Sequence, residues 1–144
     1  MKVSSRTQFG LQILCYLALR YGGEPVQSPE LATVTGTTEK YIGQIMLTLR
    51  ASPLVLSNRG AQGGYYLARH PASISLYEVL LALEGELLQF ENLSASASQE
   101  VLTNSLKVMQ GLLSASLAEP LKAYTLEDLV RQGQQISGFG DWVI

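Results

Sequence analysis

The chain has 144 residues, of which 47% are hydrophobic and 15% charged, so it can bury a core as one domain, with or without an added assembly element. No apolar run reaches the roughly 18 residues that a membrane helix needs, and the first residues lack the apolar core of a signal peptide, so we expect a cytoplasmic protein that does not enter a membrane. A single cysteine excludes an intrachain disulfide and any metal or iron–sulfur site made from several cysteines of one chain.

The charges are divided unevenly along the chain. The first 70 residues hold seven lysines and arginines against three acidic residues, whereas the remaining residues hold three against nine. The net charge of −2 therefore combines a basic half with an acidic half. This polarity favours contact between the basic half and a polyanion, although sparse charges also vary by chance.

The first predicted helix begins after Ser4 or Ser5 as the N-cap and runs to about Tyr21, where Gly22 and Gly23 follow. Its apolar residues occupy nearly every face. A helix of this kind is typically buried on more than one side, which in a chain of this length suggests a second subunit.

Two further helices are predicted in quick succession. Ser28 as the capping hydroxyl, followed by Pro29, begins a short helix that Gly36 interrupts. Thr37 or Thr38 then caps a helix over 39–51. Its inward-facing residues are Ile42, Ile45, Met46 and Leu49. The order of short helix, glycine turn and second helix with a polar outer face is that of a helix-turn-helix, although the pattern also occurs in proteins that never bind DNA.

The stretch NRGAQGGYYLAR, residues 58–69, contains three glycines between two apolar runs. A phosphate-binding loop would need GxxxxGK[ST] leading into a helix, and a dinucleotide-binding fingerprint would also need a helix at this point. Here a predicted strand over 65–68 follows, and another over 54–57 precedes. The stretch is therefore predicted to be the tip of a β-hairpin, with Tyr65 and Tyr66 on opposite faces.

Three more helices are predicted in the rest of the chain. Ser75 and Glu78 form a predicted capping box for a helix that ends near Leu83, and a loop that includes LSASAS follows within 85–98. A last short helix is predicted to begin in the stretch Thr125-Leu126-Glu127-Asp128.

The longest predicted helix runs from about Gln99 to Leu117 and is ended by Pro120. An apolar seam follows it at spacings of four and three residues. The seam covers only about two heptads, so it suits either antiparallel packing between two copies or a core helix. The seam residues are Leu102, Leu106, Met109 and Leu113.

A helix-turn-helix followed by a hairpin predicts a winged helix, a mainly α fold with a small β-hairpin. Residues 1–84 would form the DNA-binding domain, and 85–144 the dimerisation helix and C-terminal segment. Because the major groove admits one helix, helix 39–51 is the candidate reader of base edges. The wing at 58–64 would enter the minor groove, where Arg59 would meet concentrated negative potential.

The chain also resembles a known family over its first 84 residues. The matching stretches are SSRTQFGLQIL, EKYIGQIMLTLRASPLVLSNRGAQGGYYLAR and ISLYEVLLALEG. They are similar to the winged-helix bacterial regulators that include the iron–sulfur cluster regulator, the nitric-oxide-sensing repressor and the cysteine-metabolism repressor (IscR/NsrR/CymR-type). The resemblance implies a homodimer, joined through the long helix with help from the first, on a dyad-symmetric operator. The DNA-contacting positions that it implies are Thr38, Lys40, Tyr41, Gln44, Arg50, Arg59 and Gly60.

Two features depart from this family. Its cluster-sensing members carry three cysteines before the dimerisation helix, whereas residues 85–100 here contain none, so we expect no iron–sulfur cluster and no other cofactor. Position 43 is glycine where relatives often carry a side chain that helps to choose bases. Gly43 should cost helix stability and alter or relax the reading of one base.

The residues that could act in redox chemistry, metal binding or catalysis are better explained by structural roles. Cys15 lies in an apolar stretch, which favours a buried, unreactive thiol over a redox sensor. His70 is predicted to lie on the surface, since no second histidine exists to share a metal site. The sequence shows no nucleophile–base–acid set, so we do not expect an enzyme.

The leading hypothesis is a homodimeric DNA-binding transcription repressor. Two alternatives remain open at this point. The basic face could instead dock an acidic partner protein, or the main signal could come from a bound enzyme. A small molecule could also regulate the protein from a pocket between the winged helix and the dimerisation helix.

Overall fold

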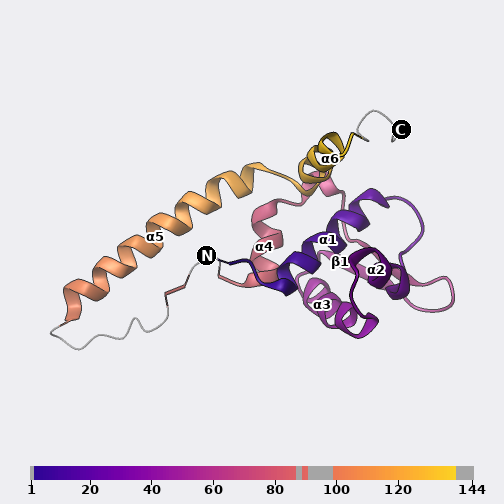
Figure 1. Ribbon diagram of the computed structural model, residues 1–144, viewed down its shortest axis with the longest axis horizontal. Coiled ribbons are helices and arrows are strands. Elements are labelled where there is room, and N and C mark those ends of the chain that lie inside the picture. The colour runs from indigo at the N-terminus through magenta and orange to yellow at the C-terminus, as the bar shows by residue number, and fades with distance from the viewer. Residues whose placement is uncertain (1, 87–88, 91–98, 139–144) are drawn as a thin grey trace.

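The computed structural model describes residues 2–86, 89–90 and 99–138. Within these ranges, a three-helix unit is followed by a hairpin, a short 3-10 turn and three further helices (Figure 1). None of the helices in the described ranges combines the length and the hydrophobicity that a bilayer crossing requires. The elements are α1 (Ser5–Leu19), α2 (Ser28–Thr35), α3 (Glu39–Ala51), β1 (Val55–Asn58), β2 (Gly64–Leu67), η1 (Pro71–Ser73), α4 (Leu76–Glu84), α5 (Glu100–Ala123) and α6 (Leu126–Ile136).

The first three helices pack around one apolar core, to which α4, the hairpin and α6 also contribute. The inward face predicted for α3 is confirmed, because all four of its residues are buried. α1 crosses this core through Ile13, Leu14 and Leu17. Gly10 allows α1 to approach α4, since an added Cβ there would lie 2.5 Å from a methyl carbon of Leu83.

The start of α2 differs from the prediction. Ser28 is the first helical residue rather than the cap, and Gln27 stands at the N-cap position without a side-chain hydrogen bond to the helix. The side chain of Gln27 instead donates a hydrogen bond to the carbonyl of Ala61 in the wing, at 3.0 Å. The proline in the first turn and the end of the helix at Gly36 are as predicted, and Gly36 adopts a left-handed conformation there.

The two strands form the predicted antiparallel hairpin, in a register that pairs Val55 with Leu67 and Asn58 with Gly64. A third segment extends the hairpin, because Val26 and Tyr65 exchange two backbone hydrogen bonds of 2.8 Å. Tyr65 packs on the core, whereas the hydroxyl of Tyr66 lies 3.4 Å from the side-chain oxygen of Asn58. The hairpin is thereby attached to the chain just before α2.

The starts of α4 and α6 lie together. Each has a capping box, formed by Ser75 with Glu78 and by Thr125 with Asp128. Backbone hydrogen bonds join the two starts, one from the Leu76 amide to the Tyr124 carbonyl (2.9 Å) and one from the Leu126 amide to the Ile74 carbonyl (2.8 Å). Leu126 is completely buried, so α6 is part of the same core as α1.

α5 projects away from the remaining helices (Figure 1). The predicted end of this helix was wrong, because α5 continues through Pro120 to Ala123. Proline removes one N–H donor, and the carbonyl that loses its partner belongs to Ser116, which is exposed and can bond to water. The loop predicted at LSASAS lies outside the described residues.

Candidate nucleic-acid interface

The N-terminal half of α3 presents a polar surface. Thr38 caps the helix by accepting a hydrogen bond from the Tyr41 amide at 3.1 Å. Thr38, Lys40 and Gln44 are exposed. Gly43 shares this half of the helix, and a Cβ added there would meet nothing within 4 Å. These groups can hydrogen-bond to phosphates or to base edges.

Tyr41 is more restrained than its neighbours. Its ring is half-buried and stands edge-on to the ring of Phe9, with 5.7 Å between the ring centres. Phe9 belongs to α1, so this contact fixes α1 against the start of α3. Tyr41 therefore supports the position of the helix in addition to presenting a hydroxyl.

Glycines shape the tip of the wing. Gly60 has a φ of +102°, a conformation that other residues rarely adopt. A Cβ on Gly63 would lie 2.3 Å from the carbonyl oxygen of Asn58, and one on Gly64 would lie 2.6 Å from that of Val26. The glycines that were predicted to shape a turn therefore also permit two close backbone approaches.

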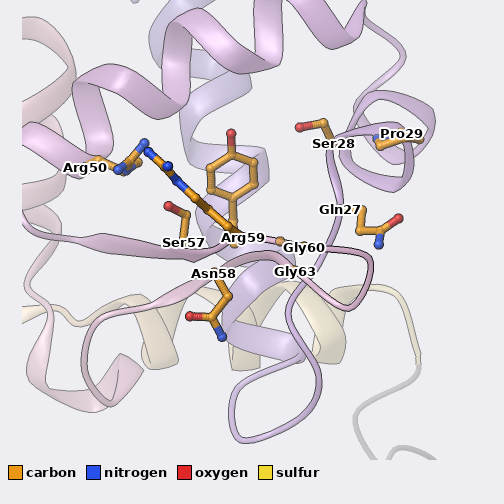
Figure 2. Close-up of a pocket in the computed structure, with 11 residues that line it drawn as sticks. Gln27, Ser28, Pro29, Arg50, Ser57, Asn58, Arg59, Gly60 and Gly63 are labelled. Carbon is orange, nitrogen blue, oxygen red and sulfur yellow. The ribbon is translucent and has the colours of Figure 1, made fainter.

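A hollow of about 400 Å³, the wing hollow, lies between the wing, the start of α2 and the end of α3. Figure 2 shows Arg50 from α3 and Arg59 from the wing extending toward one another along one side of it, with Ser57 beside them. Gln27 and Ser28 lie on the other side. The lining is mainly polar, so the wing hollow suits an anionic or strongly hydrated partner rather than an apolar one.

The two arginines carry positive charge that no described carboxylate neutralises. The ion pairs found in the described ranges involve Arg20, Arg69 and Arg131. Arg50 and Arg59 are exposed and take part in none of them. Two guanidinium groups on one side of a hollow, each able to donate five N–H bonds, form an arrangement that favours phosphate oxygens.

The structure separates the residues of the predicted site into two groups. Thr38, Lys40, Tyr41 and Gln44 lie near the start of α3, whereas Arg50 lies in its last turn beside Arg59 and Gly60. Ten residues of α-helix separate Lys40 from Arg50, a rise of about 15 Å. A ligand that contacts both groups must therefore be extended, as a nucleic-acid duplex is.

Sequence reasoning missed part of the wing hollow. Gln27, Ser28, Ser57 and Asn58 line it, although none was predicted as a site residue. Ser57 and Asn58 could have been found from their place at the end of the strand before the wing. The role of Gln27 had no local signal, because its partner Ala61 lies 34 residues away.

Comparison with known proteins places the chain in a family. Residues 3–132 match the Rrf2 family, described as iron-dependent transcriptional regulators. The chain belongs to the Rrf2 family. Its winged helix, basic wing and exposed α3 are thus those of a transcriptional regulator that binds DNA, and the resemblance predicted from the sequence is confirmed.

Several Rrf2 relatives cover most of the chain. The HTH-type transcriptional regulator CymR of Bacillus subtilis is 32% identical over 127 residues, which are 87% of this chain and 92% of CymR. The solved structure of the B. subtilis CymR covers 90% of this chain and 96% of its own, with a TM-score of 0.68 and 30% identity. That of T. potens IscR has the same TM-score, with 34% identity, and covers 94% of this chain and 90% of its own. These relatives are regulators rather than enzymes.

The Rrf2 family is described as iron-dependent. Iron–sulfur clusters are usually held by several cysteines, and this chain has one. Its only cysteine, Cys15, lies on α1 and packs against the core. Across the described residues, no group of three or more histidine, cysteine or acidic side chains could hold a metal. The residues present therefore do not fit a cluster held by three cysteines of one chain.

Proposed function

We propose that this Rrf2 protein is a homodimeric transcription repressor that binds a dyad-symmetric operator. α3 would lie in the major groove with Lys40, Tyr41 and Gln44 near the bases, and Thr38 would contact the phosphate backbone. The wing would follow the backbone and place Arg59 at the minor groove. Arg50 and the backbone of Gly60 would hold phosphates beside it.

The observation that carries this proposal is the pair of arginines in the wing hollow. Arg50 and Arg59 come from two elements, line one hollow and have no acidic partner in the described ranges. Placing two such cations together disfavours the free protein slightly and favours a bound polyanion. The polar start of α3 lies on the same helix as Arg50, so one extended duplex can contact both.

The apolar surface of α5 supports the dimer. Three predicted seam residues are strongly exposed, with 66% of Leu102, 45% of Leu106 and 51% of Met109 accessible, while Leu113 is half-buried. Further apolar side chains are exposed on the same helix, namely Val101, Val108 and Leu112. A contiguous apolar surface of this kind is costly in water and favours burial against a second copy.

The proposal can be tested by selecting duplexes from a random DNA pool with the wild-type protein and with the Arg59→Ala variant. We expect the wild type to enrich a dyad-symmetric site. The variant should bind that site more weakly by about 1–3 kcal/mol, because it loses a charge-assisted contact to DNA. Lys107→Ala on α5 is the matched control, since it removes the same charge from outside the wing hollow.

Three results would contradict parts of the proposal. Equal operator affinity of Arg59→Ala and wild type would remove the wing from recognition. Enrichment of a site without dyad symmetry would argue against a homodimer on DNA. A duplex affinity that does not fall as salt rises would contradict binding through several phosphates and would favour a protein partner for the basic surface.

A further inference from the structure

A second hollow, of about 390 Å³, lies between the end of α1, η1 and α6. Its volume falls in the range of about 300–1,000 Å³ that is usual for small-molecule sites. It shares no residue with α3 or with the wing hollow, so the proposed DNA surface does not account for it. We call it the α6 hollow; its lining consists of Ala18, Leu19, Tyr21, His70, Pro71, Glu127, Val130, Arg131 and Gln134.

One face of α6 supplies both charges of this hollow. Glu127, Val130, Arg131 and Gln134 recur at the spacing of a single helix face. The order of Glu127 and Arg131, four residues apart, would suit a direct ion pair. Arg131 instead donates from one Nη2 atom to Asp128, which leaves its other N–H groups available. Within the described ranges, the carboxylate of Glu127 has no hydrogen bond or ion pair.

The opposite wall is mainly apolar. Leu19, which is 52% exposed, and Pro71 provide aliphatic surface, and Val130 adds to it from α6. The rings of Tyr21 and His70 meet edge-on with 5.1 Å between their centres. Because Nδ1 of His70 accepts a hydrogen bond from the Ala72 amide at 3.0 Å, the neutral ring carries its proton on Nε2.

We propose that the α6 hollow binds a free α-amino acid with an apolar side chain. Its carboxylate would pair with Arg131 and its ammonium group with Glu127. Its side chain would lie against Leu19, Pro71 and Val130. Neighbours one helical turn apart have Cβ atoms about 5–6 Å apart, so both long side chains can reach the two ends of one small zwitterion. A ligand with only one charge would displace water from both Glu127 and Arg131 but pair with only one of them. Leaving the other charged side chain without a partner is unfavourable.

The position of the α6 hollow connects two parts of the chain. α1 contacts α3 through the Phe9–Tyr41 pair, and α6 follows α5 directly. A ligand bound between α1 and α6 would therefore stabilise one arrangement of the DNA-reading part relative to the projecting helix. That regulatory consequence rests on the proposed function, whereas ligand binding itself does not.

Calorimetric titration of the full chain, without DNA, tests the binding site. The probes are L-leucine, L-methionine and L-phenylalanine, each up to about 10 mM, well above a millimolar dissociation constant. We expect at least one to bind. Its amide, which lacks the carboxylate, and its N-acetyl derivative, which lacks the ammonium group, should each bind at least about tenfold more weakly, since each loses one charge-assisted contact.

Two variants test whether the amino acid binds in the α6 hollow. Glu127→Gln and Arg131→Gln should each weaken binding at least about tenfold, while Lys107→Gln on α5 should leave it unchanged. Both side chains are exposed, so the variants should fold, which circular dichroism would verify. No binding by any of the three amino acids, equal binding of both derivatives, or unchanged binding by both variants would overturn the proposal. Because DNA is absent, these outcomes are independent of whether the protein binds an operator.

Discussion

Burial raises the pKa of the Cys15 thiol from 9.0 to about 11, because desolvation disfavours the thiolate. At neutral pH, an increase of that size lowers the thiolate fraction by about a hundredfold. Since the thiolate is the reactive form, the structure supports the prediction of an unreactive thiol.

Alkylation of Cys15 by iodoacetamide at pH 7.5 should therefore be about a hundredfold slower in the folded protein than in the same chain unfolded in guanidinium chloride. Mass spectrometry of timed samples gives both rates. Comparable rates in the two states would show that the thiol is open to solvent and would revive a role as a redox sensor.

Gly43 lies within α3, where glycine costs about 1 kcal/mol relative to alanine. An added Cβ would meet nothing within 4 Å, so no packing cost opposes the gain in helix propensity. Gly43→Ala should raise the free energy of unfolding by about 0.5–1 kcal/mol in urea titrations. If α3 reads bases, the variant should also change the sequence selected from a random DNA pool.

Gly111→Ala is the matched control for this variant. Gly111 lies in α5, and an added Cβ there also meets nothing within 4 Å. It should stabilise the protein by a similar amount without changing the selected sequence. A change of the selected sequence in Gly111→Ala, or its absence in Gly43→Ala, would argue against α3 as the base-reading helix.

Among the elements, the wing depends on close contact with the segment before α2. Gly64→Ala would place a Cβ 2.6 Å from the carbonyl oxygen of Val26, and the other close atoms are also backbone atoms of Val26 and Gln27, which have little room to adjust. We expect a loss of about 1–3 kcal/mol of stability and a detached wing. Amide hydrogen exchange should report this as faster exchange at Val26 and Tyr65, whose two backbone bonds join the segments.

Gly60→Ala is a control that introduces backbone strain without a steric clash. Gly60 has a positive φ but open space around its Cα, so alanine there costs roughly 1–2 kcal/mol of strain without pushing the strands apart. Exchange at Val26 and Tyr65 should then stay close to that of the wild type. Equal acceleration in both variants would mean that the wing is not held by this contact.

Most helix boundaries could be predicted from the sequence, but the start of α2 and the end of α5 could not. The caps at Thr38 and Thr125 and the box of Ser75 with Glu78 depend on a few adjacent residues, so local sequence specifies them. The end of α5 was wrong because a proline stops a helix only where the lost hydrogen bond cannot be replaced, which the sequence alone does not reveal. The wing hollow likewise depends on segments brought together by the fold.

For the whole molecule, the exposed apolar surface of α5 predicts an assembly. Met109→Glu places a charge on this surface, where burial against a second copy would cost several kcal/mol. Sedimentation should show a dimer for the wild type and a monomer for the variant. Asn104→Glu, at an exposed position off the apolar seam of the same helix, is the control and should remain dimeric. A dimeric Met109→Glu variant would show that α5 does not form the interface.

The joined starts of α4 and α6 have a consequence for how such a chain can evolve. α4 itself packs on the core, but the chain beyond Glu84 connects through α5 back to the start of α4, where Ser75 and Thr125 pair. Each doubling of the length of a flexible loop costs only about 0.6 kcal/mol in closure entropy. The connection beyond Glu84 can thus change in length or sequence while the core, which includes α4, keeps its shape, so new sequences can be tried there without a new DNA-binding fold.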